Sequence, residues 1–148
     1  SSREIKDDEI EYILWLTSLY INLEKLPGHI AEVGVASGRN TIIFGKLIKL
    51  FSDENVRQYL GFDTFDGYVS RDINSSKHLK VDAWKTNTKR AVLDRCEEAG
   101  VAELVEIFEG DAVDTVPRVL ETHRGKKFQK GKAKIALLYI DCNAYPPP

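Results

Sequence analysis

Four short apolar segments alternate with longer segments of helical periodicity along most of the chain. The apolar segments are residues 29–35, 59–63, 104–108 and 135–140. Each has the length of a strand and is bounded by turn-forming or polar residues. Strands that alternate with helices are joined by crossover connections, so they run parallel and carry helices on both faces of the sheet. The sequence therefore predicts an α/β fold built on a parallel sheet.

Helices are predicted at residues 5–25, directly after the first strand, at 84–99, and from about residue 115. Apolar residues at steps of three and four define the inward faces of the first three. Those residues are Ile13, Leu16, Tyr20 and Leu23 in the first helix, Phe44, Leu47, Ile48 and Phe51 in the second, and Val92, Cys96 and Ala99 in the third. Gly100 is expected to end the third helix, and Pro117 to lie in the first turn of the fourth, where its missing N–H is tolerated.

Three other segments complete the predicted organisation. Residues 64–81 are polar and longer than most connections, which is typical of a functional loop. The basic segment 124–132 is interpreted as a solvated connection. The run 135–140 is the most apolar in the chain and is predicted to be a central strand, buried on both faces.

The formal charge of the chain is −2, with 21 basic and 23 acidic residues. A nearly neutral chain has no general attraction for nucleic acid or an anionic membrane, so neither is an expected partner. No apolar run approaches the ~18 residues that cross a bilayer. Two cysteines, Cys96 and Cys142, cannot form a disulfide framework, and a reducing cytoplasm is the expected compartment.

Acidic residues occur at or near the carboxyl end of every predicted strand. They are Glu32, Asp63, Asp111 and Asp141. Ligands of open parallel sheets bind beyond the carboxyl ends of the strands. Carboxylates crowded at one edge repel one another unless a ligand with hydroxyls, an amine or a metal uses them. This edge is therefore the predicted site.

Gly34 and Gly38 follow Glu32 and predict a tight turn before a helix. Their spacing is not that of dinucleotide-binding or phosphate-binding loops, and Glu32 would repel a pyrophosphate. S-adenosylmethionine carries an amino-acid end and a sulfonium but no phosphate, so it suits this turn. A tight turn without a ligand is the alternative.

The other strand ends leave two interpretations each. Asp63 can accept the hydroxyls of a ribose or cap a loop. Asp111 can accept an adenine amine or cap the following helix. Asp141 and Asn143 can together offer oxygen ligands to a cation such as magnesium (Mg2+), with Asp141 as ligand or base.

Taken in order, these segments resemble the macrocin O-methyltransferase family, whose members methylate sugar or polyketide hydroxyls. The matching segments are residues 32–38, 63–67, 110–117 and 138–145. The resemblance implies a Rossmann-like class I methyltransferase sandwich of three layers with a partial sheet in the order 3-2-1-4. It also implies one S-adenosylmethionine-binding domain over residues 1–148, expected to be the N-terminal portion of the complete fold.

The resemblance also implies roles for individual residues. Glu32, Gly34 and Gly38, with Ser37 beside them, would flank the methionine part of the cofactor. Asp63 and Thr64 would lie at the ribose, and Gly110 and Asp111 at the adenine. Asp141 would be the base and, with Asn143, a ligand of Mg2+. The acceptor would be a hydroxyl of a small molecule such as a sugar or natural product.

Two departures from the family pattern qualify these expectations. The family usually has a second aspartate where this chain has Asn143, and the chain stops at Pro148, directly after the fourth strand. The fourth strand would then be an unpaired edge, which predicts self-association into a homo-oligomer. The alternative functions are a non-catalytic module that binds S-adenosylmethionine or adenosine, and a nicotinamide-dependent dehydrogenase.

Overall fold

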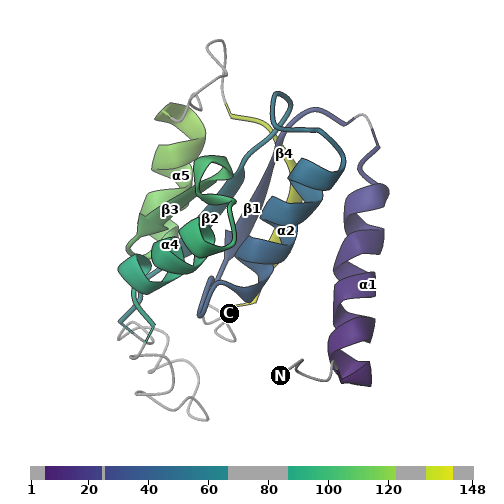
Figure 1. Ribbon diagram of the computed structural model, residues 1–148. Helices are drawn as coiled ribbons and strands as arrows, with labels where there is room; N and C mark the ends of the chain where they lie inside the picture. Colours follow the sequence, from purple (N-terminus) through teal and green to yellow (C-terminus); the bar gives the residue numbers. More distant parts are fainter. Residues whose placement is uncertain (1–5, 25, 67–86, 123–132, 142–148) are drawn as a thin grey trace, which may run out of the picture.

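The computed structural model describes residues 6–24, 26–66, 87–122 and 133–141. Its elements follow one another as α1 (Asp7–Ile21), β1 (His29–Val33), α2 (Arg39–Leu50), β2 (Tyr59–Asp63), α4 (Lys89–Glu98), a short 3-10 helix η1 (Ala102–Leu104), β3 (Val105–Glu109), α5 (Ala112–Thr122) and β4 (Ile135–Ile140). The strands form one sheet in the order β3-β2-β1-β4, and every neighbouring pair is parallel. The predicted α/β fold and strand order are confirmed (Figure 1).

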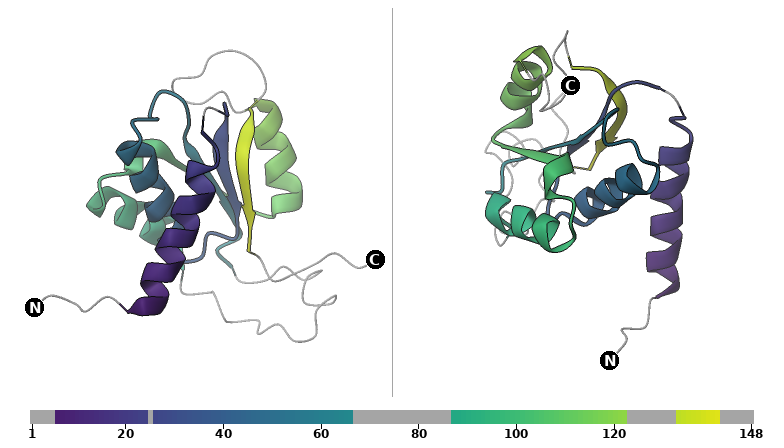
Figure 2. Two further views of the ribbon diagram at one scale, coloured as in Figure 1. Left: turned by 90° about the vertical axis from the view of Figure 1, so that its right-hand side faces the viewer. Right: turned by 45° about the horizontal axis from the view of Figure 1, so that its top comes forward.

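Helices cover both faces of this sheet (Figure 2, left). On one face α1, α2 and α4 enclose the larger core, whose buried residues include Leu16, Phe44, Tyr59 and Cys96. On the other face α5 lies over a smaller core made of Ala31, Leu60, Phe62 and Val119. No helix of the described part of the chain is long and apolar enough to cross a membrane.

The helix ends follow local chemistry. Thr88 starts α4, because its side chain accepts a hydrogen bond from the Ala91 N–H at 3.0 Å. Gly100 ends it as predicted, with a positive φ of 71° and its N–H bonded to the carbonyl of Glu97. Helix α5 begins at Ala112, earlier than predicted, so Pro117 lies inside the helix and not in its first turn. The helix starts there because Asp111 caps it directly after β3.

Two residues that were predicted to face the core are exposed instead. Leu16, Tyr20 and Leu23 are buried as expected, whereas Ile13 is 44% exposed. Phe51 is 45% exposed, because α2 ends one residue before it. A helix face buries its residues only where another element lies against it, and periodicity alone does not say how far that neighbour extends.

Strand β4, predicted from its apolar sequence to be a central strand, lies at the edge of the sheet that the described residues form. Among the described strands it pairs with β1 alone. Leu138 and Ile140, which share a face with Ala31 and Val33 of β1, are 55% and 63% exposed. Composition cannot distinguish an edge strand from a central one, because the difference lies in what the neighbouring strands do. Self-association through this edge stays a prediction.

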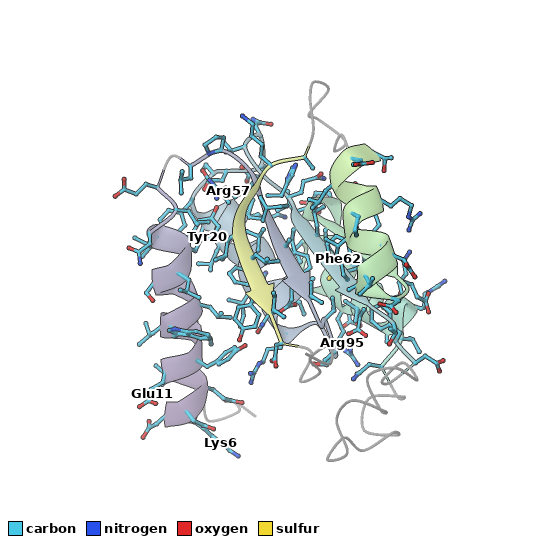
Figure 3. The ribbon with its side chains drawn as sticks, turned by 180° about the vertical axis from the view of Figure 1, so that it is seen from behind. Lys6, Glu11, Tyr20, Arg57, Phe62 and Arg95 are labelled. Atoms are coloured by element: carbon cyan, nitrogen blue, oxygen red, sulfur yellow. The ribbon has the colours of Figure 1, made fainter. Side chains whose placement is uncertain are left out.

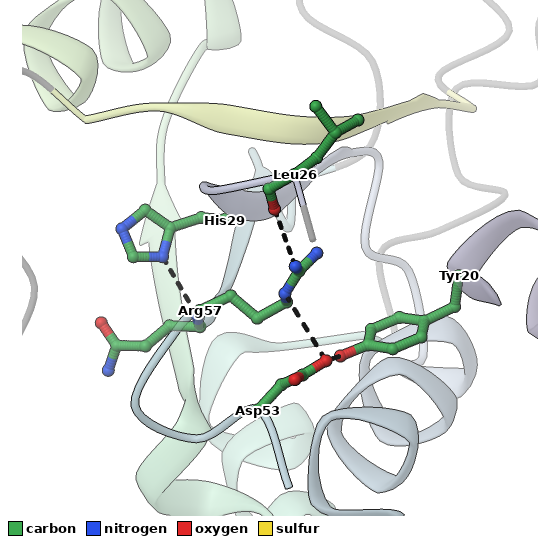
Figure 4. A network of polar contacts seen from close by, with 6 residues as sticks. Tyr20, Leu26, His29, Asp53 and Arg57 are labelled. Atoms are coloured by element: carbon green, nitrogen blue, oxygen red, sulfur yellow. Dashed lines mark hydrogen bonds and ion pairs between the residues drawn. The ribbon is translucent and has the colours of Figure 1, made fainter. Parts of the chain in front are cut away.

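Arg57 is buried at the amino-terminal end of the sheet, and Arg95 lies at the opposite end (Figure 3). Its Nη2 donates to the carbonyl of Leu26 at 2.8 Å, and its Nε lies 3.9 Å from Oδ2 of Asp53. The same Asp53 carboxylate accepts a hydrogen bond from the Tyr20 hydroxyl (Figure 4). Arg57 thus joins the end of α1, the segment before β1 and the turn after α2.

Replacing Arg57 with methionine is expected to lower the free energy of unfolding by about 2 kcal/mol, because the Leu26 carbonyl loses a charged donor and Asp53 loses its ion-pair partner. Urea unfolding measures this change. Arg90→Met is the matched control, since Arg90 and its partner Asp94 are 87% and 57% exposed; it should change stability by less than about 0.5 kcal/mol. Equal effects of the two variants would contradict the structural role of Arg57.

Candidate functional site

Residues 34–38 form a loop between β1 and α2 at the carboxyl edge of the sheet. Gly34 and Gly38 have φ values of 96° and 88°, which glycine adopts without strain. The Gly34 N–H donates to the carbonyl of Phe62 at 2.8 Å, which ties the start of the loop to β2. A Cβ on Gly38 would lie 2.9 Å from Cγ1 of Val92 in α4, so close packing also requires glycine there.

Asp63 holds this loop from the end of β2. Its Oδ2 accepts hydrogen bonds from the backbone N–H groups of Val35 and Ala36, both at 2.8 Å, and its Oδ1 accepts one from Phe65 at 3.0 Å. Asp63 therefore caps the loop, which is one of the two roles that the sequence left open. A carboxylate has about four lone-pair sites, and three donors leave room for one more. A ribose role is compatible with this geometry.

Glu32 lies two residues before the loop and is only 1% exposed. Its Oε2 accepts from Nδ2 of Asn40 at 2.6 Å, and its Oε1 accepts from the hydroxyl of Tyr59. Burial raises the pKa of Glu32 to about 7, although the two hydrogen bonds act in the opposite direction. Both carboxylate oxygens of Glu32 thus accept hydrogen bonds from protein groups. When it is ionised, this buried side chain adds a negative charge to the site.

Three further side chains extend this arrangement. The hydroxyl of Tyr12, in α1, donates to Oδ1 of Asn40. Thr41 donates to the hydroxyl of Tyr59 at 3.0 Å, and the guanidinium carbon of Arg39 lies 3.8 Å from the centre of the Tyr12 ring. Tyr12, Asn40 and Tyr59 were not predicted as site residues from the sequence. The one available signal was an asparagine at the second position of a helix, where it is a poor helix former.

Asp111 caps α5, because its Oδ1 accepts a hydrogen bond from the Val113 N–H at 3.0 Å. Gly110 has a φ of 137°, and its N–H donates to the carbonyl of Asp63 at 3.0 Å. The end of β3 is therefore bonded to the end of β2. The helix-capping interpretation of Asp111 is what the structure shows, and an adenine contact stays a prediction.

Asp141 is exposed and directly follows β4, where its N–H donates to the carbonyl of Val33 at 2.9 Å. Its charge and that of Asp63 both raise the pKa of Glu32. The carboxylates of Asp63 and Asp141 thus both lie within electrostatic reach of Glu32. Asn143 lies outside the described residues. Within the described ranges, no group of three histidine, cysteine, aspartate or glutamate residues could hold a metal ion.

The remaining predicted residues belong to the same edge. The carbonyl of Ser37 accepts a hydrogen bond from Nη1 of Arg95 at 2.6 Å, which joins the loop to α4. Thr64 follows Asp63 directly, and its Oγ1 lies 3.4 Å from the N–H of Asp66. Trp15 of α1 is 47% exposed and packs edge-on against Tyr139 of β4, with ring centres 5.8 Å apart.

The parallel sheet in the order 3-2-1-4, the glycine loop after β1 and the carboxylate at the end of β2 are features of a Rossmann-like α/β fold. A family model described as a methyltransferase domain matches residues 31–147. The chain belongs to this methyltransferase-domain family. No curated protein matches the chain significantly.

Solved structures give the same fold. The calicheamicin methyltransferase CalS11, also described as a TDP-rhamnose 3'-O-methyltransferase, has 24% identity and a TM-score of 0.69 over 95% of this chain and 56% of its own. The O-methyltransferase NovP has 20% identity and a TM-score of 0.64 over 90% of this chain and 53% of its own. TomG, an O-methyltransferase from Streptomyces achromogenes solved in complex with SAM, has 18% identity and a TM-score of 0.57 over 90% of this chain and 44% of its own. The chain spans about half the length of these proteins.

Proposed function

We propose that this chain binds S-adenosylmethionine and takes part in methyl transfer to a hydroxyl group of a small molecule. The observation that carries the proposal is the carboxylate-rich edge around the loop 34–38, formed by Glu32, Asp63 and Asp141. Negative charge at the glycine loop opposes a pyrophosphate and favours a ligand with an ammonium and a sulfonium group. Membership of the methyltransferase-domain family supports the same ligand.

In this proposal the loop residues Gly34, Ser37 and Gly38 lie along the methionine part of the cofactor. Asp63 and Thr64 bind the ribose, and Gly110 and Asp111 lie at the adenine. The resemblance of the strand ends to the macrocin O-methyltransferase family, and the sugar O-methyltransferase title of CalS11, support a sugar or natural-product hydroxyl as the acceptor.

The proposed reaction is an in-line displacement. The acceptor oxygen attacks the S-methyl carbon, so a C–O bond forms, the C–S bond breaks and the sulfonium becomes a thioether. Asp141, exposed at the end of β4, would take the proton of the hydroxyl. The contribution of the protein is to hold the two reactants at a near-attack distance.

A magnesium ion at Asp141 and Asn143 stays a proposal. Of the two predicted ligands, Asp141 is the one that the structure describes, and the described residues do not by themselves make a cation site. If Mg2+ binds, Asp141 and Asn143 would hold it and it would lower the pKa of a bound hydroxyl.

Calorimetric titration of the chain with S-adenosylhomocysteine, NAD and ATP tests the proposed ligand. We expect saturable binding of S-adenosylhomocysteine and none of the two phosphate-containing nucleotides. Binding of NAD but not of S-adenosylhomocysteine would overturn the proposal in favour of a dehydrogenase. Transfer of a radiolabelled methyl group to a mixture of sugar and phenolic acceptors then separates an enzyme from a module that only binds the cofactor.

A further inference from the structure

Five elements meet at the buried carboxylate of Glu32. It lies on β1, and its two donors come from β2 (Tyr59) and α2 (Asn40). Helix α1 contributes Tyr12, which donates to Asn40. Strand β4 contributes Tyr139, the register partner of Glu32, whose hydroxyl also hydrogen-bonds with Tyr12. The contact from α1 is notable because that helix lies outside the sheet and more than a dozen residues before the glycine loop (Figure 1).

The Tyr12 hydrogen bond orients the amide of Asn40. Because the Tyr12 hydroxyl donates to Oδ1, the Nδ2 group of Asn40 is directed to Oε2 of Glu32. A rotation of the amide by a half-turn would place an oxygen against the carboxylate, where it would repel the negative charge. Asn40 is 8% exposed, so water does not readily replace either bond.

We propose that Tyr12 and Asn40 are positioning residues of the cofactor site. They hold the Glu32 carboxylate in place and stabilise its negative charge, so that docking of α1 and binding of a cationic ligand at residues 34–38 favour each other. The inference rests on the proposed function and deepens it, since it makes α1 a part of the cofactor site. Coupling of this kind is reciprocal: whatever α1 adds to ligand affinity, the ligand adds to the docking of α1.

The charged and titratable groups around Glu32 make the coupling measurable through pH. Tyr59 from β2, Tyr139 from β4, and Asp63 and Asp141 from the ends of β2 and β4 face it, and Cys96 from α4 faces Tyr59. Arg39 of α2, the residue directly before Asn40, lies over the ring of Tyr12 in α1. The two aspartates disfavour a charged Glu32, whereas Asn40 and Tyr59 favour it. Loss of the Asn40 donor should therefore shift ionisation of Glu32 to higher pH.

The test compares the S-adenosylhomocysteine affinity of the unaltered chain, Tyr12→Phe and Asn40→Leu between pH 5.5 and 7.5. Affinity of the unaltered chain should rise across this range as Glu32 ionises. At pH 6.5 we expect about tenfold weaker binding for Asn40→Leu and about threefold for Tyr12→Phe, with the midpoint of each pH profile moved upward. Ser18→Ala, which removes an exposed hydroxyl bonded within α1, should leave the profile unchanged.

Tyr12→Phe keeps the ring that packs under Arg39, so it is informative even if Asn40→Leu does not fold. As a second measurement, S-adenosylhomocysteine should increase hydrogen-exchange protection of residues 7–21 in the unaltered chain, and less so in Tyr12→Phe. A folded Tyr12→Phe variant with an unchanged pH profile and unchanged protection would overturn this inference alone. Absence of binding by the unaltered chain at every pH would overturn the proposed function, and the inference with it.

Discussion

Replacing Asp63 with alanine is expected to weaken S-adenosylhomocysteine binding by at least about a hundredfold, which is about 3 kcal/mol. The reason is the number of backbone groups that depend on this carboxylate. Asp63 accepts hydrogen bonds from Val35, Ala36 and Phe65, so its loss releases both the glycine loop and the turn after β2. The same change should lower the free energy of unfolding by about 2 kcal/mol, since Asp63 is only partly buried and water replaces some of these bonds.

Asp66→Ala is the matched control for this experiment. Asp66 is exposed and lies three residues further along the same turn, so its removal should leave both affinity and stability nearly unchanged. Calorimetry and urea unfolding measure the two quantities. If Asp63→Ala lost stability but kept its affinity, Asp63 would be a loop cap and not a part of the cofactor site.

Replacing Glu32 with glutamine is expected to change how stability depends on pH. In the folded protein, burial raises the pKa of Glu32 from the ordinary 4.5 to about 7. A raised pKa means that the protonated form is favoured on folding. The contribution to stability is therefore fully present below pH 4.5 and is lost as the pH rises through 7. The difference between the two pKa values corresponds to about 3 kcal/mol.

Because glutamine does not ionise, Glu32→Gln should gain about 2 to 3 kcal/mol relative to the unaltered chain between pH 5 and pH 8. Urea unfolding at several pH values measures this difference. Glu109→Gln is the control: Glu109 is an exposed carboxyl at the end of β3, and its replacement should change the free energy of unfolding by less than about 0.5 kcal/mol. A difference for Glu32→Gln that does not vary with pH would show that Glu32 is not buried as described.

Glu32 relates stability to the proposed function. Above pH 7 the free protein holds a buried negative charge at Glu32, with two more carboxylates nearby at Asp63 and Asp141. Such a cluster destabilises the empty site. A cationic ligand at the adjacent loop would relieve this repulsion, so the Glu32 charge that weakens the fold above pH 7 would strengthen binding.

Several elements could be predicted from local sequence. Strand β2 has the predicted bounds, because the run from Tyr59 to Asp63 is apolar and ends in a charged residue. Gly100 ends α4 as predicted, because a left-handed residue after a helix favours glycine wherever the helix lies. The strand order 3-2-1-4 was implied by the family resemblance and not by any local pattern.

The candidate site could be predicted only in part. The acidic residues at the strand ends do gather at one edge, because parallel strands bring their carboxyl ends together. Their individual surroundings could not be derived. Glu32 is buried under donors from Asn40 and Tyr59, whereas Asp141 is exposed, although both end apolar strands.

By itself the sequence determined the class of fold, the position of the glycine loop and the edge at which the acidic groups lie, because these depend on periodicity and on the conformations that residues adopt locally. The tertiary structure alone decided that Glu32 is buried while Asp141 is exposed, that Asp63 and Asp111 cap backbone groups, and that Tyr12 reaches Asn40 from α1. Burial and hydrogen bonding depend on neighbours that are distant in the chain, and a residue's own neighbours in sequence do not specify them.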